Sequence, residues 1–246
     1  MIMGDICTRN CAFCSVENGV PIPLDSGEPL RVADAARSLA LRHVVVTSVT
    51  RDDINDHGAQ HFAQTVMMLR KVECVRTIEV LTSDCGGKID ALGKILDSNP
   101  DVFNHNVETV PALYPRIRPK ACYERSLHIL KRASQAGKGF SIKSGLMVGF
   151  GETEKEVLAL LDALKGNGCS IVTIGQYLRP SLRNIPVQEY VSPDKFAFYE
   201  EFGTSIGLEV IASPLVRSSY KADLLIQRMH DGCLPAGDHR TGNLTR

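Results

Sequence analysis

Residues 139–178 read GFSIKSGLMVGFGETEKEVLALLDALKGNGCSIVTIGQYL, and this stretch decides the fold class. Its two ends, 139–150 and 170–178, are short, continuous apolar runs typical of buried strands. Between them apolar residues recur at i, i+3 and i+4, which indicates an amphipathic helix, and Gly168 suits the end of that helix. A strand, a helix and a second buried strand form one unit of a parallel sheet with a helical crossover.

The same alternation runs along most of the chain. We expect further strands at 43–49, 77–82, 102–107 and 208–213, and helices at 31–42, 59–71, 88–100, 123–138 and 192–206. With MIMGDI as a first strand, the pattern contains six β/α units and a terminal strand. No strand is followed by G-x-G-x-x-G at the start of a helix, so a β/α barrel, partial or closed, fits better than a doubly wound sheet.

We therefore predict an α/β fold, a partial (β/α)6 TIM-like barrel, with residues 1–223 as its core. Residues 224–246 lose the alternation and are expected to form a loose C-terminal tail.

Composition argues against several classes of function. The 246 residues carry 28 basic and 28 acidic side chains, so nothing indicates binding to nucleic acid or to an anionic membrane. No apolar run approaches the ~20 residues of a membrane span, and MIMGDIC is too short and wrongly flanked for a targeting peptide. Eight dispersed cysteines favour a reducing compartment over a disulfide scaffold.

Three cysteines lie within eight residues, in the stretch CTRNCAFC: Cys7, Cys11 and Cys14. Disulfides need pairs and a closed zinc site needs four ligands, whereas three thiolates suit one cubane iron–sulfur cluster whose fourth iron has no protein ligand. The alternative is a zinc site completed by a distant residue such as His43 or Cys85. The remaining cysteines are widely spaced and are expected to be ordinary thiols: Cys74, Cys85, Cys122, Cys169 and Cys233.

Polar clusters close the other expected strands. In a β/α barrel the chemistry lies at the C-terminal ends of the strands, so we expect these clusters to face one cavity together with the cysteines. The clusters are TSVTRDD (47–53), NHNVET (104–109), GFGET (149–153) and GQYLRPS (175–181). Arg51, Asp52 and Asp53 within the first cluster could equally be a solvated group of charges.

The C-x3-C-x2-C spacing, with Phe13 before the last cysteine, resembles the radical S-adenosylmethionine superfamily. Over residues 1–223 the resemblance narrows to the lipoyl synthase family. Six segments carry it: MIMGDICTRNCAFC, VVVTSVTRDD, FNHNVETVPALYPRIRP, KSGLMVGFGET, TIGQYLRPS and PLVRSSYKAD. It implies a barrel of the radical S-adenosylmethionine type, with a [4Fe-4S] cluster on the three cysteines and S-adenosylmethionine on the open iron. Reductive cleavage of the sulfonium then yields methionine and a 5′-deoxyadenosyl radical.

The resemblance also implies a reaction, namely insertion of two sulfur atoms at C6 and C8 of an octanoyl chain. That chain is an amide on a lysine of a carrier, either the glycine cleavage H protein or the E2 component of a 2-oxoacid dehydrogenase. The implied electron donor is a ferredoxin or flavodoxin, and the implied location is the bacterial cytoplasm or, in a eukaryote, the mitochondrion or plastid. Two alternatives stay open: another radical S-adenosylmethionine enzyme such as a biotin-synthase-like sulfur inserter, or a non-catalytic barrel.

The resemblance assigns contacts with S-adenosylmethionine to the strand ends. Asn106 and Glu108 lie near its ribose and methionine groups, and Gly149 and Gly151 let the backbone approach its adenine. Taken alone, polar residues after a strand can simply cap helices, and a glycine pair can simply form a turn. The other cofactor-binding residues expected are Phe13, Thr47, Ser48 and Gln176.

RSSY, residues 217–220, is the most specific part of the resemblance. It implies that a serine, Ser219 rather than Ser218, caps one iron of a second, auxiliary [4Fe-4S] cluster, which gives up its sulfur in the reaction. The family's three cysteines for that cluster lie upstream of the first set, but only six residues precede Cys7. We therefore expect a fragment, a gene model that starts at an internal methionine, or a chain that cannot assemble the second cluster. A chain with only the first cluster is expected to cleave S-adenosylmethionine but not to insert sulfur.

Overall fold

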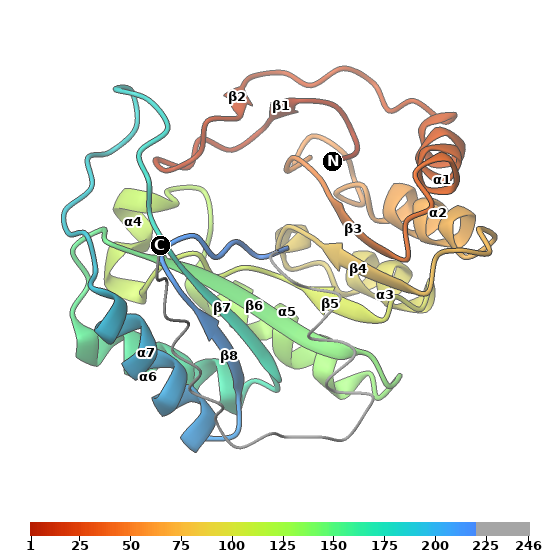
Figure 1. Ribbon diagram of the computed structural model, residues 1–246. Coiled ribbons are helices and arrows are strands. Elements are labelled where there is room, and N and C mark those ends of the chain that lie inside the picture. Colours follow the sequence, from red (N-terminus) through yellow and green to blue (C-terminus); the bar gives the residue numbers. More distant parts are fainter. Residues whose placement is uncertain (220–246) are drawn as a thin grey trace, which may run out of the picture.

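Six parallel strands form one sheet in the order β3-β4-β5-β6-β7-β8, so that order along the chain is also order in space (Figure 1). The computed structural model describes residues 1–219. The strands are β3 (His43–Thr47), β4 (Thr77–Leu81), β5 (Val102–Asn104), β6 (Ser141–Val148), β7 (Ile171–Gln176) and β8 (Glu209–Ala212). Within the described residues no backbone pairing joins β3 to β8, so the sheet is an open, partial barrel.

A helix connects each strand of the sheet to the next, as the alternation predicts (Figure 1). The helices are α1 (Glu28–Ser38), α2 (Ala59–Leu69), α3 (Ile89–Asp97), α4 (Tyr114–Ile117), α5 (Tyr123–Gln135), α6 (Glu154–Gly166) and α7 (Pro193–Ser205). Short 3₁₀ turns, η1 (Cys85–Gly87) and η2 (Pro111–Leu113), together with α4, lie after β4 and β5 and were not expected from the sequence. They lengthen the loops at the C-terminal ends of these strands.

Local sequence explains where α6 begins and ends. Thr153 and Glu156 form a capping box, in which each side chain accepts a hydrogen bond from the backbone of the other. Beyond the last turn, Gly168 has φ of 87°, and the side chain of Ser134 occupies the space that a Cβ would need. The apolar face of α6 is buried against the sheet through Val157, Leu160, Leu161 and Leu164.

The N-terminal segment differs from the expected first strand. Ile2 makes only an isolated bridge to Ser48, and a two-residue strand, β1 (Ile6–Cys7), pairs with β2 (Glu17–Asn18) in a separate small sheet. The reason is the backbone of Met3 and Gly4, whose φ angles of 67° and 84° interrupt an extended chain. The main sheet therefore has six strands instead of the seven counted from the sequence.

Charged residues lie inside the barrel, on the sheet face opposite the helix-packed apolar side chains. Lys143 of β6 donates to both carboxylate oxygens of Glu79 of β4, at 3.0 and 2.9 Å. Both side chains are 1% exposed, and Asn104 of β5 donates to the same carboxylate at 2.8 Å. Lys143 also donates to the carbonyl of Ser218, so this buried pair holds the segment after β8 against the interior of the sheet.

No helix among residues 1–219 is long and apolar enough to cross a membrane.

The Lys143→Met variant tests the buried pair. It would leave the Glu79 carboxylate buried without its cation, so the free energy of unfolding should fall by about 3–5 kcal/mol in urea denaturation. The double variant Lys143→Met/Glu79→Gln removes both charges and should recover most of that loss. An equal loss in the single and double variants would show that the missing contacts, and not an uncompensated charge, cause the instability.

Candidate active site

The three cysteines of the N-terminal stretch lie in one loop beside the C-terminal ends of the strands. We call residues 7–14 the cysteine loop. All three cysteines are half-buried, and the backbone of Cys14 donates to the carbonyl of Cys11 at 3.0 Å. Two sulfur atoms accept backbone hydrogen bonds at 3.4 Å, Cys7 Sγ from Arg9 and Cys14 Sγ from Val16. The loop therefore presents thiols that already have N–H donors beside them.

Burial and neighbouring charges shift the pKa values of two of the thiols. Burial raises the pKa of Cys11; Arg118 opposes this, while Glu108 and the other two thiols raise the pKa further. Burial also raises the pKa of Cys14, against the hydrogen bond from Val16, and Cys7 and Glu108 add to the rise. Three thiols and one carboxylate thus share a neighbourhood in which a bound cation or cationic cluster would favour the thiolates.

The zinc site considered from the sequence has no complete ligand set among the described residues. Among residues 1–219, no three His, Cys, Asp or Glu side chains lie close enough together to hold one metal ion. His43, proposed as a zinc ligand, begins β3 at the opposite end of the sheet, and Cys85 is buried with a pKa raised by burial to about 12. In a cubane each thiolate bonds a different iron, so its ligands stand farther apart than those of one ion.

Hydrogen bonds tie the cysteine loop to the loops after β3, β5 and β7. The Thr8 amide donates to the Thr50 carbonyl at 3.1 Å, and the Ala12 amide donates to the Ile117 carbonyl at 2.9 Å. The side-chain amide of Asn184 donates to the carbonyls of Ala12 and Cys14, at 3.2 and 2.9 Å. The strand ends that the sequence predicts to face one cavity are therefore gathered around the cysteines.

Phe13 anchors the loop through aromatic packing. Its ring lies 6.4 Å from that of Phe150, which stacks on Tyr177 at 4.4 Å. Ile117 completes this small buried cluster, which joins the ends of β6 and β7 to the cysteine loop. Phe13 is thus fixed by packing within the protein, and its contact with a cofactor remains a prediction.

The charged cluster after β3 is only partly solvated, because Arg51 is buried whereas Asp52 and Asp53 are exposed. Arg51 is 2% exposed, and its guanidinium donates to the carbonyls of Met3 and Ile22 and to the carboxylate of Asp53. Asp52 instead receives two hydrogen bonds from Arg9 of the cysteine loop, at 2.8 and 2.9 Å. These charges hold the N-terminal segment onto the sheet.

Asp84, in the loop after β4, is fully buried between two arginines. Its carboxylate accepts from Arg9 Nη2 at 2.5 Å and from Arg125 Nε at 2.7 Å. Burial alone would raise the pKa of Asp84, but the hydrogen bond and charge of Arg9, with His105 and Arg125, hold it far below its usual range. Asp84 is not among the site residues expected from the sequence, because its partner Arg9 lies 75 positions away.

Thr47 and Ser48 end β3 beside the N-terminal segment. The Thr47 carbonyl accepts a hydrogen bond from the Ile2 amide at 2.8 Å, and Ser48 forms the bridge with Ile2. Both residues are half-buried at the rim.

Asn106 and Glu108 follow β5, close to the cysteine loop. Glu108 has φ of 67°, and its backbone forms a bridge with Leu146 of β6. Burial raises the pKa of its half-buried carboxyl, although the charge of Arg118 and a hydrogen bond from Asn106 oppose this. The side-chain oxygen of Asn106 is buried and has no hydrogen-bond partner among the described residues. A buried acceptor without a donor is costly, so this atom is suited to a ligand.

Arg118 is a residue that the sequence reasoning missed. Its guanidinium donates to the carbonyls of Asn106 and Val107, each at 3.1 Å, while its Nε is buried with no partner among the described residues. Its charge acts on both Cys11 and Glu108. The arginine-rich YPRIRP stretch after NHNVET was the available signal.

Gly149 and Gln176 hold a loop of the protein itself. A Cβ on Gly149 would lie 2.2 Å from Gln176 Nε2, and Gly149 has φ of 104°. The Gln176 amide donates to the Glu189 carbonyl at 3.0 Å and accepts from the Val191 amide at 2.9 Å. Gly151, with φ of 103°, has only the side chain of Gln188 nearby. Both glycines are required by turn geometry, and approach of an adenine remains a prediction.

The segment after β8 crosses the barrel interior. The Val216 carbonyl lies 2.2 Å from where a Cβ of Gly175 would stand, so this close approach requires glycine. Ser218 is half-buried and held by Lys143, whereas Ser219 is exposed. Tyr220 and the predicted tail, 224–246, lie outside the described residues.

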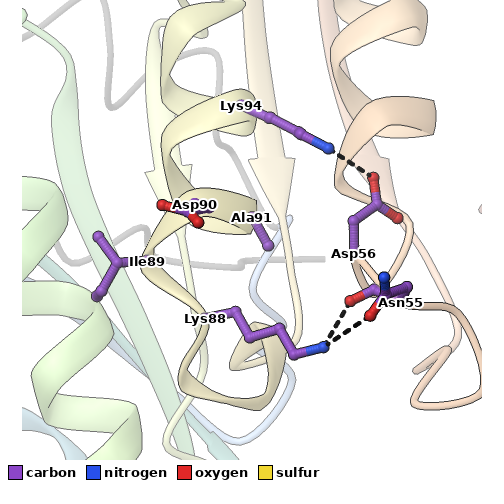
Figure 2. Close-up of a pocket in the computed structure, with 7 residues that line it drawn as sticks. All are labelled: Asn55, Asp56, Lys88, Ile89, Asp90, Ala91 and Lys94. Atoms are coloured by element: carbon purple, nitrogen blue, oxygen red, sulfur yellow. Dashed lines mark hydrogen bonds and ion pairs between the residues drawn. The ribbon is translucent and has the colours of Figure 1, made fainter.

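Two hollows lie near the strand ends. One, of about 580 Å³, is lined by Cys11 and Cys14 together with Asn18 and Asn184. The other, of about 430 Å³, lies between the loop before α2 and the start of α3 (Figure 2). Lys88 donates to Asn55 there, Lys94 lies 3.5 Å from Asp56, and the hollow contains none of the predicted site residues. The first hollow is therefore the opening beside the cysteine loop.

Comparison with known proteins places this fold and site in the radical S-adenosylmethionine superfamily, whose sequence profile matches residues 1–164. Two solved structures resemble the fold. Methylornithine synthase (PylB) has a TM-score of 0.64 at 15% identity, over 96% of this chain and 82% of its own. Streptococcus suis SuiB bound to S-adenosylmethionine has a TM-score of 0.66 at 11% identity, over 86% of this chain and 49% of its own. The predicted α/β fold, a partial barrel of the radical S-adenosylmethionine type, is confirmed.

Sequence relatives narrow the class further. The chain is 57% identical over 225 residues to the lipoyl synthase of Caldanaerobacter subterraneus subsp. tengcongensis, covering 91% of this chain and 79% of the relative. It is 54% identical over 228 residues to that of Oleidesulfovibrio alaskensis, covering 92% of this chain and 78% of the relative. The chain belongs to the lipoyl synthase family.

The Asp84→Asn variant tests the buried carboxylate after β4. Because the folded-state pKa of Asp84 lies below its unfolded value, its stabilising contribution is complete above about pH 4 and is lost as the pH falls toward the folded value. At neutral pH the variant should unfold with about 3 kcal/mol less free energy than the wild type. Urea titrations at several pH values should show this difference narrowing below about pH 4. A difference that stays constant with pH would contradict the ionic role of Asp84.

Proposed function

We propose that this chain inserts two sulfur atoms at C6 and C8 of an octanoyl chain, held as an amide on a lysine of a lipoyl-carrier protein. The sulfur would come from an auxiliary iron–sulfur cluster, and two S-adenosylmethionine molecules would be consumed per lipoyl group. The carrier is the glycine cleavage H protein or the E2 component of a 2-oxoacid dehydrogenase. The observation that carries the proposal is the cysteine loop, with three half-buried thiols at the strand ends of a partial barrel in a lipoyl synthase family chain. A ferredoxin or flavodoxin is the proposed electron donor. The proposed location is the bacterial cytoplasm or, in a eukaryote, the mitochondrion or plastid.

Cys7, Cys11 and Cys14 would hold three irons of a [4Fe-4S] cluster, and the donor set fits that role. With S-adenosylmethionine on its open iron, such a cluster supplies one-electron cleavage that produces a hydrogen-abstracting radical. The protein's own contribution is to place the thiols and their hydrogen bonds. The amides of Arg9 and Val16 donate to two of the sulfurs, and such bonds tune the reduction potential of a cluster.

The proposed contacts with S-adenosylmethionine come from the rim around the cysteines. Asn106 offers a buried, unpartnered acceptor, and Glu108 offers a carboxylate whose charge already acts on Cys11 and Cys14. These two suit the ribose hydroxyls and the methionine amino group, which are hydrogen-bond donors. The further proposed cofactor contacts are Phe13, Thr47, Ser48, Gly149, Gly151 and Gln176. The side-chain amide of Gln176 is already hydrogen-bonded to the backbone of Glu189 and Val191. Its proposed contact would therefore be made by other atoms at this position of the rim.

Ser219 is the proposed serine ligand of an auxiliary cluster, with Ser218 as the less favoured alternative. The exposure of Ser219 supports this choice, since the backbone of Ser218 is fixed by Lys143. The described residues do not bring three further cysteines to Ser219, because Cys74 and Cys169 precede β4 and β7 at the other end of the sheet. We therefore derive no mechanism for sulfur transfer from the second cluster.

The function is tested with the full chain, reconstituted anaerobically with iron and sulfide. It is mixed with S-adenosylmethionine, a chemical reductant and a peptide that carries N6-octanoyl-lysine. With the first cluster alone we expect 5′-deoxyadenosine by chromatography. Sulfur-containing octanoyl-lysine, detected by mass spectrometry, is expected only from a chain that also carries the auxiliary cluster, with about eight irons in all. A fully loaded chain that forms no 5′-deoxyadenosine would refute radical chemistry. A chain with about eight irons that forms 5′-deoxyadenosine but no thiolated peptide would refute sulfur insertion.

The Cys11→Ala variant tests the cluster ligands. Methyl cannot replace a thiolate at iron, so we expect loss of bound cluster and at least a hundredfold less 5′-deoxyadenosine, measured after reconstitution. Cys74→Ala, which removes a half-buried thiol at the other end of the sheet, is the matched control and should retain both. If Cys11→Ala cleaved S-adenosylmethionine at the wild-type rate, the cysteine loop would not be the cluster-binding site.

The Glu108→Gln variant tests the proposed contact with the cosubstrate. It keeps the shape of the side chain and removes its charge, so S-adenosylmethionine should bind about tenfold more weakly while iron content stays unchanged. The measurement is a titration that follows the change in the electron paramagnetic resonance spectrum of the reduced cluster. Binding as tight as in the wild type would exclude a direct contact.

A further inference from the structure

Arg9 has a burial unlike that of its neighbours. It stands between Cys7 and Cys11 and is 6% exposed, whereas all other residues of the cysteine loop are half-buried or exposed. A charged side chain is placed inside a protein at a cost unless partners compensate its charge. The residues that pair with Arg9 therefore indicate the structural role of this buried charge.

Arg9 binds two carboxylates that come from different strand ends. Its Nε and Nη2 grip both oxygens of Asp52 after β3, at 2.8 and 2.9 Å, and Nη2 also donates to Asp84 after β4 at 2.5 Å. Asp84 in turn accepts from Arg125 of α5 at 2.7 Å. Two arginines and two carboxylates thus form one network, and His57 Nδ1 lies 3.3 Å from Asp52 Oδ1 at its edge. Its geometry uses the planar fork of a guanidinium, which the single ammonium of a lysine cannot reproduce.

The backbone of Arg9 connects this network to the sulfur chemistry. Its amide donates to Cys7 Sγ at 3.4 Å, while its side chain fixes the residue against β3 and β4. The neighbouring Thr8 hydroxyl donates to the Thr50 carbonyl at 3.0 Å, and this second tie holds the same turn. All these bonds are made by the protein alone and need no bound cluster.

We infer that Arg9 is a positioning residue: clamped by Asp52 and Asp84, it orders the cysteine loop before a cluster binds and keeps an N–H donor at the Cys7 sulfur. The inference rests on the proposed function for the purpose of the loop, but the clamp itself exists without it. Asp52 and Asp84 are then positioning residues as well. The segments TSVTRDD (47–53) and LTSDCGG (81–87), which contain them, would therefore act on the same loop. Neither carboxylate contacts the three cysteines in the network described above.

The test compares Arg9→Lys with Arg125→Lys in the full chain. Both variants keep the charge, so neither leaves a buried carboxylate without a cation. Arg125→Lys alters the same Asp84 but none of the bonds to the cysteine loop, which makes it the matched control. In the cluster-free proteins, hydrogen exchange of a peptide spanning residues 7–14 should be about ten- to a hundredfold faster in Arg9→Lys, as expected when a charged hydrogen bond is lost. In Arg125→Lys it should stay near the wild-type rate.

After reconstitution, the reduction potential gives a second readout, which general instability would not shift. An N–H donor at sulfur stabilises the more negative, reduced cluster, so losing it should make the potential more negative in Arg9→Lys and leave it unchanged in Arg125→Lys. Wild-type exchange and wild-type potential in Arg9→Lys would overturn the inference.

The wild-type chain keeps the inference testable if Arg9→Lys does not fold. The amides of Thr8, Ala12 and Cys14 should be protected from exchange in the cluster-free wild type, and exchange at the rate of an unstructured peptide would overturn the inference. Failure of the proposed function looks different: the loop is protected and Arg9→Lys loosens it, yet the wild type binds no cluster. That outcome would support the role of Arg9 in ordering the loop and would refute the proposal that the loop binds a cluster.

Discussion

The burial of Arg9 between Asp52 and Asp84 is the constraint on which the geometry of the site depends. A short loop with three cysteines has no core of its own, and its amides and thiols would otherwise be free to turn toward water. Ion pairs to the ends of β3 and β4 fix its middle, and hydrogen bonds to the loops after β5 and β7 fix the rest. Because these strand ends belong to one parallel sheet, the barrel determines where the sulfur atoms stand.

Buried charges also fix the position of a segment in the barrel interior. Lys143, Glu79 and Asn104 replace apolar packing with a small buried network, and Lys143 extends it to the backbone of Ser218. Such a network costs more to bury than apolar side chains do, but it specifies one position for the segment that crosses it. The cysteine loop and the Arg217–Ser219 segment are thus both held by charges that the sheet supplies. The proposed reaction needs both in fixed places.

Much of the fold could be predicted from the sequence, since strand and helix differ in the period of their apolar residues. The expected strand 77–82 is β4 (Thr77–Leu81), and the expected helix 59–71 is α2 (Ala59–Leu69). The first strand could not be predicted, because left-handed angles at Met3 and Gly4 are a local backbone choice that no periodicity reveals. The short α4 and the 3₁₀ turns were missed since they are shorter than any helical pattern.

Some residues of the candidate site could be predicted from the sequence, and others could not. Cys7, Cys11 and Cys14 could be found because the spacing of three cysteines along the chain is itself typical of cluster ligands. Arg118 and Asp84 could not, since their importance comes from partners far away in sequence. The pattern also did not separate side chains that face a ligand from those that serve the protein: Gln176 ends its strand as expected, yet its amide holds residues 189 and 191.

The central claim is that the cysteine loop holds one cubane whose fourth iron is open to S-adenosylmethionine. Its most direct test is electron–nuclear double resonance on the reduced, reconstituted chain with S-adenosylmethionine carrying a labelled methionine nitrogen. Iron content is measured on the same sample. The account predicts about four irons per chain and a coupling between the labelled nitrogen and the cluster. Stoichiometric zinc in place of iron, or a full cluster without any coupling to the labelled nitrogen, would contradict it.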